Sequence, residues 1–523
     1  MSVLPGADPR TLAQRLQISL GESITMSARN APDVASFVLD DGSSHTFAQT
    51  NARVNRLVSA LRSAGVGPAD RLAVFALDSH RYVEIVLAAA KLGAVYVPLN
   101  YRLTRQEVDV LVGRAEPVVL FHDDRYATLL EGIAEQHASL RHVVSLDGEG
   151  DAYEDLLATG TEDEPLVVAS DSDILGLAFT SGTTGLPKGV LQTQRMIKAI
   201  VNAQVIDYRM RAGEVRYCAA PAFHISGVCG LLAGVARGFT SVLMPQFDAR
   251  RVLDLMIADE ITAAFMVPTM ISTVMQMPDV ADHDYERLEL IYYGASAMSP
   301  TLLARAMDIF GCDFLNAFGA GTEAGLQAVL SPEDHRRALA GHPELLGSIG
   351  KPSYGVAMRI VDDEMNDVAP GEVGEIATRS DMLFEGYLGM PEETERALRD
   401  GWFRAGDMGY VDDSGYIYLH GRKKDMIIRG GENIYPIEIE STLAEHPQVV
   451  QSAVVGVADE HWGEVVRAFV QVVEGATVTP EELATHCGER LARYKVPAEF
   501  RLVAALPTNA SGKILKRELR TET

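Results

Sequence analysis

Short apolar runs alternate with helix-like segments along the first third of the chain. Residues 47–61 and 82–92 carry apolar side chains at helical spacing. Segments with the length and apolar content of buried strands lie at residues 71–77, 94–98, 118–121, 143–146 and 174–179. Because strands that alternate with helices pair in parallel, this pattern predicts an α/β fold built on parallel sheets. The acidic stretch 148–164 is expected to be a surface connection.

The pattern changes after residue 421. The run Arg422-Lys423-Lys424-Asp425 places charge between two ordered segments, which is typical of a linker. It is followed by a helix that begins near Pro436, strands at 452–457 and 468–473, and a helix from Glu481. This succession predicts a small α+β domain at the C-terminal end of the chain.

Composition narrows the class of protein. A chain of 523 residues with 47% apolar content predicts more than one domain with an ample core. The 46 basic and 72 acidic residues give a net charge of −26, which argues against non-specific binding to nucleic acid or anionic membranes. The four cysteines are scattered, so we expect neither a disulfide framework nor a zinc site. We expect a cytoplasmic protein without a secretory signal or an integral membrane segment.

The loop from Thr180 to Gly189 is the segment with the clearest chemistry. It follows the apolar run 174–179 and contains three glycines, four hydroxyl side chains and Lys188. Glycines let backbone N–H groups approach an anion closely, hydroxyls donate to phosphate oxygens, and the lysine adds a positive charge. These features predict a phosphate cradle, although a polar surface loop has a similar composition. The usual P-loop pattern does not match, because Pro187 precedes the lysine.

Further candidate residues follow along the chain. His224 lies among Phe, Ile and small residues. This setting is consistent with two roles: a histidine that lines a ligand site, or a histidine that is hydrogen-bonded within the core. The strand that ends at Tyr293 opens into Gly294, Ala295 and Ser296, which suits either a flat ligand or close packing.

Two segments place carboxylates beside glycines. Phe318 and Gly319 lead to Thr322-Glu323, whose oxygens could hold Mg²⁺ or cap a helix. Asp407 follows a glycine and could accept both hydroxyls of a ribose, or could be a turn aspartate. Lys513 follows Ser-Gly on a polar loop, where a lysine is normally only exposed.

Taken in order, these segments resemble the successive motifs of AMP-forming acyl-CoA synthetases. The resemblance includes the loop 180–189, residues 221–224, 319–323 and 406–407, and the segments 421–440 and 512–513. It covers nearly the whole chain, from about residue 45 to residue 517. The same superfamily of adenylating enzymes includes peptide-synthetase adenylation domains and firefly luciferases.

The resemblance implies a fold and a reaction. It implies a large N-terminal AMP-binding domain of stacked sheets and helices, residues 1–423, and a small mobile C-terminal lid, residues 424–523, with a hinge near Lys424. It also implies two half-reactions. A carboxylate first attacks the α-phosphate of ATP and gives acyl-AMP and pyrophosphate, and the thiolate of CoA then attacks the acyl-AMP and releases AMP.

The same resemblance implies roles for individual residues. The expected ATP and AMP contacts are Thr180, Ser181, Gly182, Thr183, Thr184, Gly185, Lys188, Gly294, Ala295, Ser296, Phe318, Gly319, Thr322, Asp407, Arg422 and Lys513. Expected Mg²⁺ ligands are Glu323 and Thr184, and expected CoA contacts are Gly430 and Gly431. The expected catalytic residues are Lys513, Glu323, Thr322, Lys188 and His224. The family usually has an aromatic residue, Gly, one further residue, Thr and Glu, but this chain is one residue longer between Phe318 and Glu323.

The acid itself is left open by the sequence. The expected pocket residues His224, Ile225, Tyr293, Gly294, Ala295 and Phe318 favour an apolar tail, in a medium- or long-chain fatty acid or an aromatic or alicyclic acid. One alternative is an adenylating enzyme that loads a carrier protein, and a luciferase-like oxidation is another. From a different class, a catalytically silent nucleotide-binding regulator is also consistent with the motifs. A homodimer is expected from the family alone.

Overall fold

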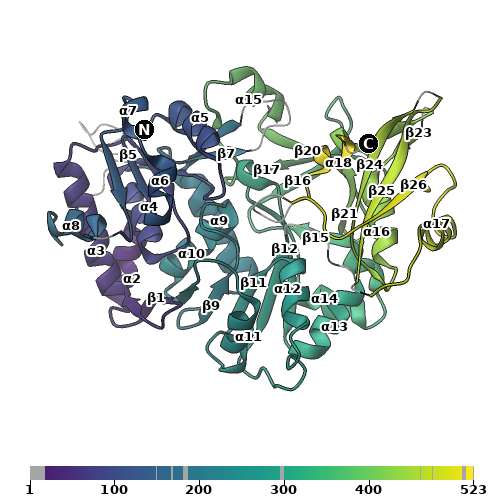
Figure 1. Cartoon of the computed structure of the whole chain (residues 1–523), viewed down its shortest axis with the longest axis horizontal. Coiled ribbons are helices and arrows are strands. Elements are labelled where there is room, and N and C mark those ends of the chain that lie inside the picture. Colours follow the sequence, from purple (N-terminus) through teal and green to yellow (C-terminus); the bar gives the residue numbers. More distant parts are fainter. Residues whose placement is uncertain are drawn as a thin grey trace, which may run out of the picture.

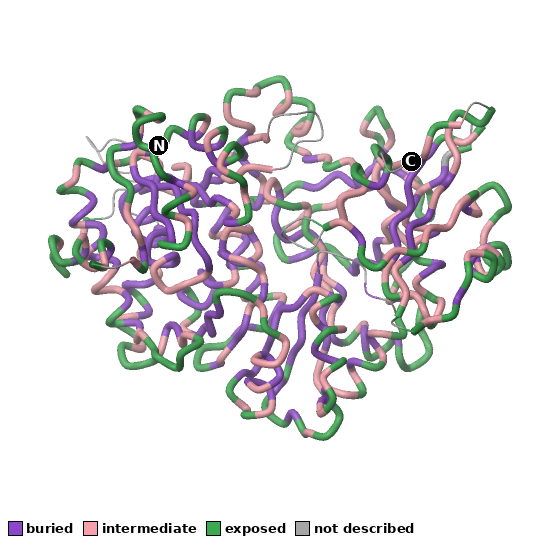
Figure 2. The backbone as a smooth tube through the Cα atoms, viewed as in Figure 1, coloured by how far each residue is buried: buried purple, intermediate pink, exposed green. Residues whose placement is uncertain are grey.

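The computed structural model of the chain describes most of its length (Figure 1). The described residues are 18–148, 150–166, 169–180, 187–294, 298, 300–430, 432–459, 461–473, 475–508 and 514–521. These residues form three β-sheets with helices packed around them. In Figure 2 the buried positions follow the strands and the inner faces of the helices, while the exposed positions lie on the outer turns.

The first sheet has seven strands in the order β18-β8-β7-β4-β3-β5-β6. The strands β7, β4, β3, β5 and β6 run parallel, and β8 lies antiparallel to β7. This confirms the predicted parallel α/β unit. The strand bounds are β3 (Arg71–Phe75), β4 (Val95–Pro98), β5 (Val119–His122), β6 (His142–Ser145), β7 (Ile174–Thr180), β8 (Lys188–Thr193) and β18 (Gly386–Tyr387).

The second sheet has fourteen strands and changes character along its length. Its parallel part includes β9 (Val215–Cys218), β10 (Thr240–Leu243), β11 (Ala263–Met266), β12 (Leu290–Gly294), β13 (Asp313–Gly319) and β1 (Ala35–Leu39), with β2 (Ser44–Thr46) antiparallel at the edge. The antiparallel part contains β14 (Leu326–Leu330), β15 (Ser348–Pro352), β16 (Ala357–Val361), β17 (Gly374–Arg379), β19 (Leu398–Arg399), β20 (Trp402–Val411) and β21 (Ile417–Arg422).

The third sheet takes all of its strands from the C-terminal part of the chain. Its members are β22 (Ile427–Arg429), β23 (Glu432–Ile434), β24 (Val449–Asp459), β25 (Gly463–Val472) and β26 (Glu499–Val503). The helices α16 (Pro436–Ala444), α17 (Pro480–Gly488) and α18 (Lys516–Thr521) belong to the same part. Mixed pairing and separate helices confirm the predicted small α+β unit. The domain boundary at residues 423 and 424 stays a prediction.

Helices cover the faces of the first two sheets (Figure 1). They are α2 (Glu22–Asn30), α3 (Phe47–Ser63), α4 (His80–Leu92), α5 (Arg105–Ala115), α6 (Ala127–Leu130), α7 (Ile133–Gln136), α8 (Ala152–Ala158), α9 (Gln194–Asp207), α10 (Ile225–Arg237), α11 (Ala249–Ile257), α12 (Pro268–Met275), α13 (Pro300–Phe310), α14 (Pro332–Leu339) and α15 (Pro391–Ala397). Local sequence explains where α3 starts, because Thr46 and Gln49 form a capping box there.

The prediction for residues 148–164 was wrong in part. This acidic stretch contains α8, whose N-terminus is capped by Asp151. Tyr153 and Leu157, four residues apart on one helix face, are buried. Two buried apolar positions among many acidic residues were not enough to predict this helix from the sequence.

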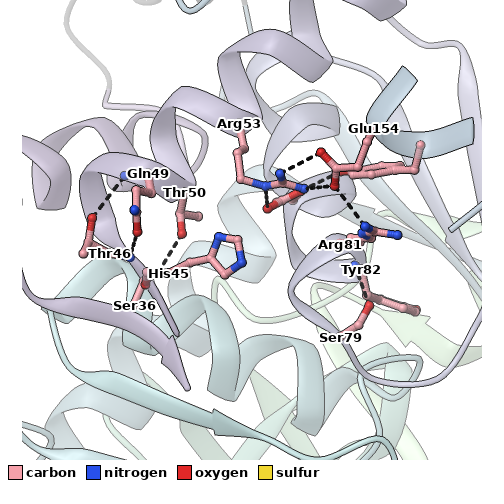
Figure 3. Close-up of polar contacts among 12 residues, drawn as sticks. Ser36, His45, Thr46, Gln49, Thr50, Arg53, Ser79, Arg81, Tyr82 and Glu154 are labelled. Atoms are coloured by element: carbon pink, nitrogen blue, oxygen red, sulfur yellow. Dashed lines mark hydrogen bonds and ion pairs between the residues drawn. The ribbon is translucent and has the colours of Figure 1, made fainter. Parts of the chain in front are cut away.

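A charged cluster joins α3, α4 and α8 (Figure 3). Arg53 donates to both carboxylate oxygens of Glu84 and both of Glu154, at 2.6 to 3.2 Å. Burial raises the pKa of Glu84, and hydrogen bonds from Arg53 and Tyr153 oppose that rise. Because an unpaired buried carboxylate is costly, the cluster fixes these helices in one arrangement.

A second buried cation, Lys91, joins α2, α3 and α4. Its Nζ atom lies 2.7 to 2.9 Å from oxygens of Thr25, Asn51, Asn55 and Glu164. Burial alone would raise the pKa of Glu164, but hydrogen bonds from Lys91, Thr25, Asn51 and Asn55 hold it at about 2, against an ordinary value of 4.5. The ionised carboxylate therefore stabilises the folded chain at pH values above 4.5, and this contribution is lost as the pH falls from 4.5 towards 2.

Glu164→Gln tests this contribution. At pH 7 the variant should unfold at a lower temperature than the wild type. The gap in unfolding temperature should narrow as the pH falls below about 4.5, because Glu164 then takes up a proton in the unfolded wild type while the folded wild type keeps it ionised. Thermal unfolding followed by circular dichroism between pH 7 and pH 3.5 gives the gap. Glu162→Gln is the matched control, since the Glu162 carboxylate forms an exposed ion pair with Arg56. A gap that does not change with pH contradicts the assignment.

Candidate active site

The predicted phosphate loop joins two antiparallel strands. Thr180 ends β7 and pairs directly with Lys188, the first residue of β8. The loop residues Ser181, Gly182, Thr183, Thr184 and Gly185 lie outside the described residues. A strand follows this loop, whereas a helix follows the loop of a P-loop protein, so the structure agrees with the mismatch seen in the sequence.

Lys188 is held between an acid and an aromatic ring. Its Nζ atom lies 2.7 Å from Oε2 of Glu393, at the start of α15. The same ammonium lies 4.8 Å from the centroid of the Tyr387 ring, within the range of a cation–π contact. The ammonium holds the pKa of Glu393 below its ordinary value. A negatively charged group is therefore already bound to the lysine that was predicted to bind phosphate.

Glu323 lies beside this lysine. It belongs to the short helix η2 (Gly321–Glu323), which follows β13. Its Oε1 atom accepts a hydrogen bond of 3.2 Å from the hydroxyl of Tyr387. Burial raises the pKa of Glu323, while the charges of Lys188 and Arg422 act in the opposite direction. An added cation would favour the ionised form of this carboxylate further.

Backbone contacts fix η2 against the first sheet. Gln192 on β8 donates to the carbonyl of Thr322 at 3.0 Å. The backbone N–H of Phe384 donates to the carbonyl of Glu323 at 2.8 Å. The β7–β8 hairpin, η2 and the segment before β18 thus meet in one place, although they are far apart in sequence.

The strand end at Gly294 is closely packed. A Cβ atom at this position would come within 2.4 Å of the carbonyl oxygen of Ala317 on the neighbouring strand, so only glycine fits. The residues Ala295 and Ser296 lie outside the described residues. Phe318 packs against the apolar cluster of β14–β17 and β21, and Gly319 is exposed at the end of β13. The stacking of Phe318 on adenine stays a prediction.

The predicted pocket residues Tyr293 and Ile225 lie in two different apolar clusters, on opposite faces of the sheet. The Tyr293 side chain is buried against α13 and α14, and its hydroxyl lies 3.0 Å from Nε2 of His335. Ile225 packs in the other cluster, together with Tyr292. Alternation along the strand places Tyr292 and Tyr293 on opposite faces, and sequence alone did not say which face meets Ile225.

Asp407 and Arg422 pair with each other across β20 and β21. Nε of Arg422 lies 2.9 Å from Oδ1 of Asp407, and the two residues are direct neighbours in the register. Asp407 is 6% exposed. A carboxylate has about four lone-pair sites, so this pair leaves acceptor capacity for ligand hydroxyls.

His224 caps α10. Its Nδ1 atom lies 2.8 Å from Oγ of Ser226, and it also faces the backbone N–H of that residue. The residue therefore lies at the end of a helix rather than inside the core. α10 follows β9, so this helix end is at the carboxyl edge of the parallel strands, as is Gly294.

Residues of the linker form ion pairs with the part of the chain before it and with the part after it. Lys423 pairs with Asp363 at 2.5 Å, and Arg520 of α18 pairs with Asp425 at 3.2 Å. Lys424 lies between them in η4 (Lys423–Asp425) and is exposed. Gly430 has a φ of +58°, and a Cβ there would clash with the Trp462 ring at 2.7 Å. Gly431 and Lys513 lie outside the described residues.

The structure thus brings together Thr180, Lys188, Thr322 and Glu323, and pairs Asp407 with Arg422. Sequence reasoning missed Tyr387, Glu393 and Gln192, whose contacts join distant segments and leave no periodic signal. The described residues contain no group of three or more His, Cys, Asp or Glu side chains arranged for a metal. One carboxylate such as Glu323 still fits Mg²⁺, which usually takes one or two carboxylates together with substrate phosphates.

No helix among the described residues is long and apolar enough to cross a membrane.

Comparison with known proteins finds matches over most of the chain. Residues 24–388 match the family model of AMP-binding enzymes, and residues 438–513 match that of the AMP-binding enzyme C-terminal domain. A fatty acid–[acyl-carrier-protein] ligase, ScoC of Streptomyces coeruleorubidus, is 36% identical over 96% of each chain. A long-chain-fatty-acid–CoA ligase, FadD13 of Mycobacterium tuberculosis, is 34% identical over 91% of this chain and 93% of its own. A solved anthranilate CoA ligase, AuaEII in complex with anthranoyl-AMP, superposes with a TM-score of 0.89 at 26% identity, covering 97% of both chains.

Glu393→Gln tests whether Glu393 competes with a bound nucleotide for Lys188. Without the acid, Lys188 is free for phosphate, so the Kd for ATP should fall roughly threefold, as expected for a half-exposed ion pair. Isothermal titration calorimetry measures the change. The control is Glu392→Gln, which removes the same charge from the neighbouring exposed position of α15. Equal affinity of the two variants, or weaker binding by Glu393→Gln, contradicts the competition.

Proposed function

This chain belongs to the AMP-binding enzymes, and from that premise we propose that it is an ATP-dependent acid–CoA ligase. In the first half-reaction a carboxylate oxygen attacks the α-phosphorus of ATP, the bond to pyrophosphate breaks, and acyl-AMP forms. In the second the sulfur of CoA attacks the acyl carbon, the bond to AMP breaks, and the thiol proton is released. The observation that carries the proposal is the meeting of Lys188 and Glu323 beside the phosphate loop.

The chemistry of the first half-reaction explains why such a site is needed. Two anions, a carboxylate and a triphosphate, have to approach each other, so the site has to neutralise charge and fix the reacting atoms. Lys188 would bind phosphate once Glu393 has moved aside. Glu323, with Thr184 of the loop, would hold Mg²⁺, which when bound neutralises phosphate charge and polarises the phosphoryl group. Tyr387 keeps the Glu323 carboxylate oriented.

The nucleoside end would lie along the second sheet. Asp407 would accept the ribose hydroxyls, with Arg422 fixing its carboxylate through the 2.9 Å ion pair. Gly294, Ala295 and Ser296 would line the adenine, and Phe318 would stack on it. Gly294 supports this placement because its strand end has no side chain in the way. His224, at the same edge, would border the reacting carboxylate.

The second half-reaction would use a different position of residues 424–523. Lys513 would reach the α-phosphate during adenylation and would leave when this domain rotates about Lys424. Gly430 and Gly431 would then face the pantetheine of CoA. Rotation requires a few residues that absorb a change in backbone angles, and the exposed linker at Lys424 is suited to this. The Lys423–Asp363 pair lies on the N-terminal side of Lys424 and the Arg520–Asp425 pair on its C-terminal side, so rotation about Lys424 breaks neither of them.

A carrier protein is the second candidate acceptor. It is favoured by one observation, the 36% identity to a ligase that is named for an acyl-carrier protein. The two candidates share the adenylation step and differ only in the thiol that takes the acyl group.

A product assay with ATP, Mg²⁺, CoA and a panel of acids tests the proposal. The expected products, identified by mass spectrometry, are AMP, pyrophosphate and an acyl-CoA. Formation of ADP would overturn the adenylation reaction. AMP and acyl-AMP without a thioester would identify a carrier protein as the missing acceptor. A control without acid measures background hydrolysis of ATP.

Lys513→Ala tests whether Lys513 acts in the first half-reaction and not in the second. Adenylation should fall by roughly a hundredfold or more, as when a transition-state donor is removed. Transfer from supplied acyl-AMP to CoA should be largely retained, because the lysine has left the site by then. Arg517→Ala, which removes a neighbouring exposed cation, is the control. Equal loss in both half-reactions contradicts domain alternation.

A further inference from the structure

The face of the second sheet that meets α9 and α10 is arranged in three rows of side chains. The outer row, nearest the carboxyl edge, contains Val267, Gly294 and Ala317. The middle row contains Cys218, Phe265, Tyr292 and Leu315, which are direct neighbours in the register of β9, β11, β12 and β13. The inner row contains Arg216, Ala263, Leu290 and Asp313. Side chains two residues apart on a strand share a face, so the rows follow one another into the protein.

The outer row is small and the middle row is large. Gly294 has no side chain, and Val267 and Ala317 are short, so no large side chain fills this level of the sheet face. Two residues further in, the Tyr292 ring lies 4.9 Å from the Tyr208 ring and 5.4 Å from the Phe265 ring. All three aromatic residues are less than 9% exposed. These three rings close the space between the sheet and α9. They lie two strand residues from Gly294, which at roughly 3.3 Å per residue is about 6.6 Å along β12 from the carboxyl edge.

The inner row beyond this barrier is charged. A cavity of about 150 Å³ lies there and is lined in part by Tyr208, Glu214, Arg216 and Leu290. Nε of Arg216 bonds Glu214 at 2.7 Å, and its Nη1 atom has no hydrogen-bond partner among the described residues. An alkyl tail that entered this cavity would bury charged groups without replacing their hydration, which is costly. The cavity is therefore not a continuation of an apolar tunnel.

One polar side chain faces the space above the barrier. Gln204 lies one helical turn from Tyr208 and one turn from Ile200 on α9. Tyr208 contacts the middle row, and Ile200 lies against Gly325, just beyond η2. Since residues four apart share a helix face, Gln204 points to the level between the aromatic barrier and the site. It is 5% exposed, and its Oε1 atom has no hydrogen-bond partner among the described residues.

We infer that the acid pocket is short, with Tyr208, Phe265 and Tyr292 as its floor and Gln204 as a hydrogen-bond acceptor in its wall. This rests on the proposed function, because it takes the carboxylate to lie near His224 and Gly294. The substrate class is then a compact acid, about one aromatic ring long, that carries a hydroxyl or amino donor. Such a donor would satisfy the buried Gln204 oxygen, which a plain hydrocarbon leaves unpaired.

The first test compares acids of different length with the full-length enzyme. AMP formation is measured with benzoate, the hydroxybenzoates, hexanoate, decanoate and palmitate. The hydroxybenzoates should have the highest kcat/KM, and decanoate and palmitate the lowest. Efficient use of palmitate, or a kcat/KM for benzoate that equals or exceeds that for every hydroxybenzoate, would overturn the inference. Absence of AMP with every acid would instead count against the proposed function.

Variants of Tyr292 in the pocket floor and Gln204 in the pocket wall test the role of each residue in substrate choice. Tyr292→Leu should raise the ratio of kcat/KM for decanoate over benzoate by ~10-fold, since it opens the middle row. Tyr293→Leu is the matched control, because that side chain lies on the opposite face. Gln204→Leu should lower the ratio for the preferred hydroxybenzoate over benzoate by ~10-fold. Equal shifts in both tyrosine variants, or an unchanged hydroxybenzoate ratio in Gln204→Leu, would overturn it. Circular dichroism checks that each variant folds, and Phe265→Leu replaces Tyr292→Leu if that variant does not.

Discussion

The candidate site depends on holding opposite charges close together where little water reaches them. Tyr387 makes this possible, because its hydroxyl donates to Glu323 and the face of its ring meets the Lys188 ammonium. Burial disfavours the charged form of Glu323, and the nearby cations offset that cost. A site that already balances these charges can accept a highly charged substrate by exchanging partners, without first building a new arrangement. The Glu393–Lys188 pair is the contact that has to be exchanged.

The fold supplies this balance by bringing strand ends from two sheets to one place. β7 ends at Thr180, β12 at Gly294 and β13 at Gly319, and each is the carboxyl end of a strand in the parallel part of its sheet. Ligands of open α/β sheets commonly bind at such ends. The same strands continue inward as the rows that set the depth of the acid pocket. Chemistry at the edge and specificity below it are therefore properties of one set of strands, separated by only two residues along β12.

Much of the fold was predictable from the sequence, because periodicity and strand length directly reflect burial. The parallel unit β3–β7 and the small C-terminal sheet are in this class. Side-chain partners were harder, since Lys188 meets a glutamate 205 residues away and Glu323 a tyrosine 64 residues away. The choice between Tyr292 and Tyr293 shows a second limit: alternation separates the two faces of a strand, but the packing of α9 decides which face lines a pocket.

The central claim is that the carboxylate of the acid attacks the α-phosphate of ATP, and the most direct test follows an oxygen atom of that carboxylate. If the carboxylate attacks the α-phosphate, an acid labelled with heavy oxygen in its carboxyl group passes one labelled oxygen to AMP when the thioester forms. Mass spectrometry of the AMP should therefore find this label after a complete turnover with ATP and CoA. Label in inorganic phosphate, with unlabelled AMP, would mean that the acid attacks a different phosphorus atom and would contradict the account.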